Sequence, residues 1–106
     1  MKQVKVFIHP HRAADIIHRL TSAGYDGITL FDVQGLLQAL DRREQRYSVE
    51  VGESVIDEVQ IELVCEDERV AQAVALVQDA AGSADGWIHV LPVEASYRLG
   101  RTTKQD

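Results

Sequence analysis

The sequence is short of the features that define several protein classes. It has one cysteine among 106 residues, so no disulfide can form within the chain. No apolar run approaches the roughly 20 residues that span a membrane, so we expect no membrane span. Basic side chains number 11 against 17 acidic ones, and the net charge of −6 argues against binding to a nucleic-acid backbone. These shortages exclude an internal disulfide scaffold and leave a small acidic domain.

The length and the opening residues predict where and how the chain folds. A chain of this size builds one domain around one modest core, and we assign residues 1–106 to it. The opening MKQVKVFIHPH carries charges where a signal peptide needs its apolar run. A lone cysteine also suits a reducing compartment. We therefore expect a cytoplasmic protein.

The first half of the chain reads as strand, helix, strand. Apolar and polar residues alternate over 4–9, which predicts a strand. Pro10 is suited to the first position of a helix, whose apolar stripe runs as far as Gly24. Glycine there favours the left-handed conformation that ends many helices. A second strand follows over 27–35.

The second half repeats that order. A strand is predicted over 58–66, with Cys65 in its core-facing phase as a small hydrophobic residue. Asp67 is predicted to cap a helix over 67–82, and the last strand covers 87–93. The whole order indicates an α+β, ferredoxin-like βαββαβ fold, a four-stranded antiparallel sheet with two helices on one face.

The other face of such a sheet has no element left to cover it. The alternation places seven apolar side chains there: Phe7, Phe31, Val33, Val64, Trp87, Leu91 and Val93. A monomer rarely leaves that much contiguous apolar surface in water. We expect other copies of the chain to cover it, and a patch for a different partner is the alternative.

A long polar stretch separates the two halves. Residues 36–57 carry a run of charged residues and little apolar periodicity. Structureless loops of about 20 residues are uncommon inside a compact domain and are usually functional or disordered. A solvated hairpin extension, partly helical around 36–46, is the simpler structure for it.

Six segments in a fixed order carry a resemblance to a known family. They are KQVKVFIHP at 2–10, GIT at 27–29, VQG at 33–35, VQIELVC at 59–65, DERV at 67–70 and ADGWIHVLPVEA at 84–95. In this order and spacing the chain resembles the PII signal-transduction family over essentially its whole length. The resemblance implies a homotrimer, with the open sheet faces turned inward.

The resemblance also implies an adenine-nucleotide site in each cleft between subunits. Three segments would build it: a T-loop over about 36–57, a B-loop over about 81–87 and a C-terminal tail over about 96–106. The T-loop would also engage a protein partner that the sequence does not name. The implied nucleotide-binding residues are Gly27, Ile28, Thr29, Gly35, Leu36, Leu37, Gln38, Glu62, Val64, Asp85, Gly86, Trp87, Arg98 and Arg101.

Departures from the family pattern indicate a divergent member. The B-loop AGSADGW is shorter than in the family and has lost both lysines, and only Arg98 of the two tail arginines aligns. Glu58 stands where the family has a lysine that meets 2-oxoglutarate, and Gln38 is displaced by one position. We therefore expect AMP or ADP to bind at least as well as ATP, and 2-oxoglutarate not to bind. The type associated with carboxysomes or bicarbonate uptake is the subtype we favour.

Two other functions were weighed against this one. His9, His11 and His89 could bind a metal if the first and last strands bring them together, as in a CutA-like trimeric metal-binding or structural adaptor protein. We expect no specific metal site, because no cysteine or carboxylate stands at ligand spacing. An enzyme is not expected, since no serine in the chain lies in a nucleophile motif and no P-loop is present.

Overall fold

A computed structural model describes residues 1–36, 45–48 and 53–100, and side chains outside 33–57. The elements in chain order are β1 (Lys2–Ile8), α1 (Pro10–Ser22), β2 (Thr29–Leu36), β3 (Gln45–Ser48), β4 (Glu53–Cys65), the 3₁₀ turn η2 (Asp67–Arg69), α2 (Val70–Ala81) and β5 (Gly86–Pro92). Within the described residues, no helix has the length and apolar character needed to cross a membrane.

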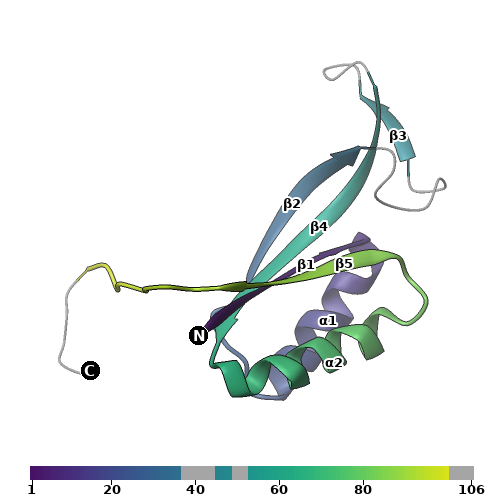
Figure 1. Cartoon of the computed structure of the whole chain (residues 1–106). Coiled ribbons are helices and arrows are strands. Elements are labelled where there is room, and N and C mark those ends of the chain that lie inside the picture. Colours follow the sequence, from purple (N-terminus) through teal and green to yellow (C-terminus); the bar gives the residue numbers. More distant parts are fainter. Residues whose placement is uncertain (37–44, 49–52, 101–106) are drawn as a thin grey trace.

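The strands form one antiparallel sheet in the order β2-β4-β1-β5, and both helices lie on the same side of it (Figure 1). α1 packs on β4, and α2 packs on β1. The predicted ferredoxin-like fold is thus confirmed. The order leaves β2 and β5 as the two edge strands, a point that matters for the site.

The strands around the polar stretch are longer than the pattern predicted. β4 begins at Glu53, before the expected start at Glu58, and the short strand β3 pairs with its first residues. This agrees with a hairpin extension, because Gln45–Ser48 lie opposite Glu53–Ile56. The predicted helical part around 36–46 is not seen at its ends, which are strand, and its middle lies outside the described residues.

The core lies between the sheet and the helices. It is made of alternate residues of β1 and β4 and the inner stripes of the helices: Val4, Val6, Ile8, Val59, Ile61, Leu63, Ile16, Leu20, Ala73 and Val77. Period-2 alternation in the strands and the helical period in α1 and α2 both point these side chains inward. Cys65 is half-buried against this core, where burial raises the pKa of its thiol.

The helix ends follow the sequence in one case and not in the other. Pro10 opens α1 as predicted, and Gly24 has φ +94° just beyond its end. Asp67 does not cap α2, which is a correction to the prediction. Its carboxylate instead accepts a hydrogen bond from the amino group of Met1 at 2.6 Å, while the turn η2 starts after Glu66. The Asp67 carboxylate is thus paired with the charged amino group of Met1 and does not cap the backbone N–H groups at the start of α2.

Tyr25 and Arg69 tie the loop after α1 to the start of α2. The Tyr25 hydroxyl lies 2.7 Å from the carbonyl oxygen of Arg69 and 2.8 Å from Gln72 Oε1, and its single hydrogen can be donated to either acceptor. The Arg69 guanidinium lies 4.0 Å from the Tyr25 ring centre and donates to the carbonyl of Ala23 at 3.0 Å. Burial raises the pKa of Tyr25. Arg69, part of the DERV segment, therefore has a structural role, since its guanidinium holds the loop after α1 against the start of α2.

Candidate functional site

The face of the sheet away from the helices, here called the open face, carries three rows of side chains. Read across β2, β4, β1 and β5, the rows are Phe31, Gln60, Phe7 and Trp87; Thr29, Glu62, Lys5 and His89; and Val64, Gln3 and Leu91. Phe31, Val64, Trp87 and Leu91 are exposed, as predicted, and Phe7 is half-buried. Val93 follows β5 and is half-buried, and the side chain of Val33 lies outside the described set.

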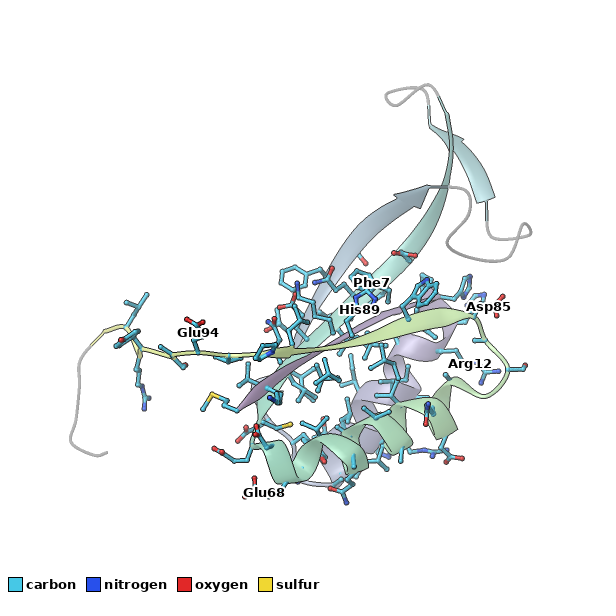
Figure 2. All side chains as sticks on the ribbon, in the orientation of Figure 1. Phe7, Arg12, Glu68, Asp85, His89 and Glu94 are labelled. Atoms are coloured by element: carbon cyan, nitrogen blue, oxygen red, sulfur yellow. The ribbon has the colours of Figure 1, made fainter. Side chains whose placement is uncertain are left out.

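Aromatic rings gather at the β5 side of this face. His89 packs edge-on against Phe7, with ring centres 5.6 Å apart, and lies 6.3 Å from the Trp87 ring (Figure 2). Trp87 is 60% exposed, although tryptophan is usually well buried. The cluster is thus a surface of three aromatic rings across β1 and the edge strand β5, with the rings packed against one another.

Glu62 is the polar centre of the same face. Its carboxylate lies 3.7 Å from Lys5 Nζ and accepts a hydrogen bond from Gln3 Nε2 at 3.3 Å. Gln60 donates to its other oxygen. These partners come from β1 and from Glu62's own strand, so the carboxylate is held in place before any ligand arrives.

A concave pocket of about 300 Å³ opens beside Glu62 at the β2 edge. Its lining residues are Gln3, Asp26, Gly27, Thr29, Glu62, Leu63 and Val64. Four of them belong to the predicted nucleotide-binding set: Gly27, Thr29, Glu62 and Val64. Gly27 has φ +65°, a conformation that glycine adopts without strain, and it turns the chain into β2. Carboxylate, hydroxyl and amide groups around an apolar floor suit a ligand with N–H or O–H donors.

Two lining residues were missed by sequence reasoning. Gln3 lies on the open face opposite Val64, and Asp26 precedes the turn at Gly27. The alternation in β1 could have found Gln3, because it shares a face with Phe7. Asp26 carried no signal, since an aspartate beside glycine is typical of any turn.

The other predicted site residues do not join this pocket within one chain. Asp85, Gly86 and Trp87 lie at the start of β5, on the opposite edge of the sheet from β2. Gly35 and Leu36 end β2, far along the strand from Thr29. Ile28 is half-buried against the core. Arg98 is exposed beyond β5, and Leu37, Gln38 and Arg101 lie outside the described residues.

Gly86 is fixed by the sheet itself. A Cβ at this position would lie 2.3 Å from the carbonyl oxygen of Phe7 in β1. No side chain can be accommodated at that distance from a backbone atom. Glycine here is therefore required by the pairing of β1 with β5, whatever else it contacts.

Glu58 is an unexpected buried acid at the base of the long loop. Its side chain is only 8% exposed, and Oε2 has no hydrogen-bond partner among the side chains and backbone that the structure describes. Burial raises the pKa of this carboxyl above its ordinary value. The sequence placed a negative charge here but gave no signal of its burial, because a charged residue at the end of a predicted strand is usually solvated.

The histidines are arranged differently from the metal hypothesis. His9 and His11 do lie together, with ring centres 4.2 Å apart, and His9 Nδ1 accepts the backbone N–H of His11 at 3.1 Å. His89 pairs with Lys5, whereas the end of β1 next to His9 pairs with Gly86. The expected approach of His89 to His9 is thus wrong. Across the described ranges, no group of three or more His, Cys, Asp or Glu side chains could hold a metal ion.

These features define a class of small α+β domains with an open sheet face, a long connection between two paired strands and a pocket at a sheet edge. Comparison with known proteins narrows the class. The family model described as Nitrogen regulatory protein P-II matches residues 1–104, and the chain belongs to this P-II family. The family's description is that of a regulatory protein.

Relatives named Nitrogen regulatory protein P-II align over nearly the whole chain. The protein of Azospirillum brasilense is 30% identical over 102 residues, which cover 93% of this chain and 91% of the relative. That of Rhodospirillum rubrum is 29% identical over the same shares of both chains. The Cyanidium caldarium protein is 28% identical over 98% of this chain and 94% of its own. Family membership is shown, and the carboxysome-associated subtype stays a prediction.

Proposed function

We propose that the protein is a homotrimeric, cytoplasmic regulator that binds AMP or ADP in clefts between its subunits and signals through the loop 36–57 to a protein partner. The observation that carries this proposal is the pocket at the β2 edge. Four of its lining residues are residues that the family resemblance assigns to the nucleotide. They reach it from separate segments, the turn before β2 and the end of β4, so sequence neighbourhood does not account for their meeting.

The pocket suits the adenosine end of the ligand. Adenine offers an exocyclic amine and ribose offers hydroxyls, and Glu62 and Thr29 can accept hydrogen bonds from such donors. Lys5, which neighbours Glu62 on the open face, is already paired with that carboxylate at 3.7 Å. A phosphate would find little positive charge there, so we place the phosphates outside this pocket.

The phosphate end depends on Arg98 and on the backbone at Asp85 and Gly86. Arginine binds phosphate oxygens in a bidentate way. The loop before β5 brings a carboxylate where the family has lysines, and this disfavours added phosphates. A hydrogen bond to a charged group contributes roughly 1.5–3 kcal/mol, or about ten- to hundredfold in affinity. AMP or ADP should therefore bind at least as well as ATP.

The positions of the two groups of site residues support an assembly of more than one copy, which we propose to be the trimer. Within one chain, Thr29 and Glu62 lie toward the β2 edge of the sheet. Asp85 to Trp87 lie at the start of β5, which is the opposite edge. A site that needs both groups requires the β2 edge of one copy to lie near the β5 edge of another. Association through the open faces would also bury Trp87 and Phe31, which the chain alone leaves exposed.

The effector is proposed from charge. Glu58 places a carboxyl group where the family has a lysine, so a dicarboxylate such as 2-oxoglutarate meets no salt-bridge partner. We propose a signal from inorganic carbon, as bicarbonate, in place of the nitrogen signal. The CutA-like metal-binding alternative has lost its main support, because His89 faces Lys5 rather than His9.

The test is calorimetric titration of purified trimer with AMP, ADP and ATP. Thr29→Val and Glu62→Gln should each weaken AMP and ADP binding about tenfold, because each removes an acceptor from the pocket. Glu68→Gln is the matched control, since Glu68 is an exposed acid beside α2, away from the pocket (Figure 2). Absence of nucleotide binding, or equal effects of all three variants, contradicts the proposal. Thermal-shift measurements with bicarbonate and 2-oxoglutarate test the effector separately.

A further inference from the structure

Asp26 is the one of the two acids in the β2-edge pocket whose carboxylate is still available. Its side chain is exposed and lines the pocket beside Gly27. Among the described residues, it takes part in no hydrogen bond or ion pair. Glu62, the other acid, already accepts hydrogen bonds from Gln3 and Gln60, and it lies 3.7 Å from Lys5. Both carboxylate oxygens of Asp26 are therefore open to a ligand.

The backbone fixes Asp26 at the rim of this pocket. Tyr25, the residue before it, is 3% exposed, and its N–H donates to the carbonyl of Leu20 at 3.1 Å. Gly27, the residue after it, has φ +65°, and β2 begins at Thr29. The turn is anchored on both sides, so the backbone at Asp26 has a defined place at the edge of the sheet.

The interior of the pocket differs from its rim. Thr29 and Glu62 lie directly opposite each other in β2 and β4, and Val64 follows Glu62 on the same face. A flat base finds an apolar contact in Val64 there, and hydrogen-bond acceptors in Thr29 and Glu62. The proposed function places adenine in this interior, and the sugar joined to it then reaches the rim, where Asp26 lies.

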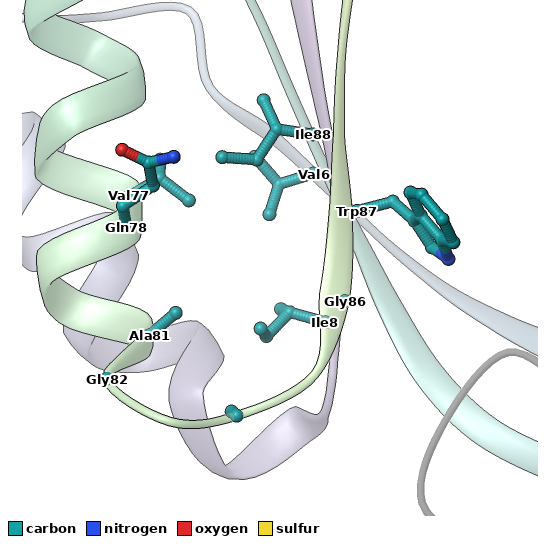
Figure 3. A pocket seen from close by; sticks show the side chains of 10 residues that line it. Val6, Ile8, Val77, Gln78, Ala81, Gly82, Gly86, Trp87 and Ile88 are labelled. Carbon is teal, nitrogen blue, oxygen red and sulfur yellow. The ribbon is translucent and has the colours of Figure 1, made fainter.

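A second hollow in the chain has no comparable acceptor. It has a volume of about 410 Å³ and lies between α2 and β5 (Figure 3). Apart from Gln78, the side chains that line it are largely apolar, and the walls formed by Val6, Ile8 and Val77 are 1–2% exposed. Trp87 points away from it, to the other side of β5. Of the two hollows, only the β2-edge pocket thus offers charged acceptors to a sugar.

We propose that the Asp26 carboxylate binds the 2′- and 3′-hydroxyls of the ribose and makes the pocket selective for ribonucleotides over deoxyribonucleotides. An ionised carboxylate only accepts hydrogen bonds, and its two oxygens match the two adjacent hydroxyl donors of a ribose. An acidic side chain binds a ribose hydroxyl in the same way in dinucleotide-binding folds. The inference rests on the nucleotide site of the proposed function and adds the residue that recognises its sugar.

The same negative charge acts against the phosphates. Like charges repel, and each phosphate beyond the first adds negative charge to the ligand that Asp26 holds by its sugar. Asp26→Asn should therefore weaken the recognition of the sugar and, at the same time, raise the affinity for ATP relative to AMP. A purely structural role of Asp26 predicts neither change.

Calorimetric titration with sugar analogues of AMP tests the assignment. Wild-type protein should bind 2′-deoxy-AMP and 3′-deoxy-AMP about tenfold more weakly than AMP, because each lacks a hydroxyl that donates to a charged acceptor. In Asp26→Asn, the affinity for AMP should fall and the preference for AMP over both analogues should largely disappear. Asp15→Asn, which changes an exposed aspartate of α1 outside the pocket lining, is the control and should keep the wild-type preference.

Each outcome decides the inference. Loss of the preference in Asp26→Asn, with the preference kept in Asp15→Asn, supports it. Equal wild-type affinity for AMP and its deoxy forms, or an unchanged preference in Asp26→Asn, overturns the sugar contact and leaves the proposed nucleotide site intact. Absence of any nucleotide binding overturns both.

A second measurement separates the sugar from the base. The 5′-monophosphate of purine riboside lacks the exocyclic amine of adenine but has the same ribose. Asp26→Asn should weaken the binding of this nucleotide as much as it weakens the binding of AMP. An effect on AMP alone would mean that Asp26 accepts a hydrogen bond from the base, which overturns the assignment. Circular dichroism checks that the variant keeps its fold.

Discussion

The two faces of one sheet differ in how they are covered, although the same strands supply both. On the helix side, alternate residues of β1 and β4 such as Val6 and Ile61 are almost fully buried by the chain's own helices. On the open face, a row that contains Phe31 and Trp87 and a row that contains Val64 and Leu91 flank a polar row centred on Glu62. A purely apolar face would associate without preferred orientation, whereas a charged row between apolar rows restricts which partner and which angle fit. The first face specifies the fold, and the second is left for assembly and ligand.

The largest expected effect is a loss of folding stability from a substitution on the helix-covered face. Leu20→Ala removes a fully buried side chain of α1 and should destabilise the protein by up to about 5 kcal/mol, through lost apolar burial and a residual cavity. Leu91→Ala, on the open face, should change the unfolding of the dissociated chain far less. Urea unfolding at two protein concentrations separates the two. Equal losses from both substitutions at low concentration would show that the two faces are not distinct.

The next largest effect is weaker assembly, without loss of the fold, from a substitution on the open face. Trp87→Asp replaces the most exposed aromatic side chain of the face with a charge, and assembly would bury that charge without a partner. We expect trimer formation to weaken by about 3 kcal/mol. Light scattering at micromolar concentration measures this, and circular dichroism reports the fold. Ala75→Asp, which adds the same charge at an exposed position of α2, is the control. A trimer that survives Trp87→Asp argues against association through this face.

A smaller effect separates the two ends of the nucleotide. Arg98→Ala should weaken the binding of ADP by about 1.5–3 kcal/mol, because one charge-assisted hydrogen bond is lost. Adenosine, which lacks phosphate, should bind the variant and the wild type equally. Calorimetry with both ligands measures the difference. ATP binding tenfold tighter than ADP and AMP, or an unchanged ADP affinity in the variant, would show that the phosphate site is built from other residues.

The smallest effect concerns Glu58 and pH. Because burial raises its folded pKa, the native chain holds this proton to higher pH than the unfolded chain does, and stability declines as pH rises through that window. Glu58→Gln removes the charge and should stabilise the protein by about 1 kcal/mol at pH 8, with the gain vanishing near pH 4. Thermal unfolding of both proteins from pH 4 to 8 gives the comparison. A gain that is constant with pH would mean that the carboxyl does not titrate in this range.

Glu58 also provides a test of the effector proposal. Wild-type protein should show no 2-oxoglutarate binding with or without ATP and magnesium, since Glu58 offers no positive charge. Calorimetric detection of micromolar affinity would contradict this.

Local rules in the sequence were enough for the elements and their faces. Alternation in 4–9 and 58–66 and the helical stripe after Pro10 correctly gave the strands, the first helix and the core. These patterns suffice because burial on one face dictates them directly. Four of the predicted site residues line one pocket, and their contact with a nucleotide stays a prediction.

What failed depended on contacts between distant segments. Asp67 had the sequence of a helix cap, but the Met1 amino group is a closer and charged donor. His89 was placed beside His9 because the register of β1 with β5 was unknown, and that register shifts it to Lys5. The burial of Glu58 likewise arises from neighbours that the local pattern does not specify. Residue type and period carry no information about such pairings.

The tight approach of β5 to β1 at Gly86 has a consequence for mutational tolerance. In a library of single substitutions selected only for folded, soluble protein, position 86 should be depleted of every replacement, since even alanine would meet the Phe7 carbonyl at 2.3 Å. Asp85 and Trp87 on either side are exposed and should tolerate many. A second selection for nucleotide binding would then add constraint at 85 and 87 but none at 86. The fold of this chain therefore requires glycine at position 86, whether or not the residue contacts a phosphate.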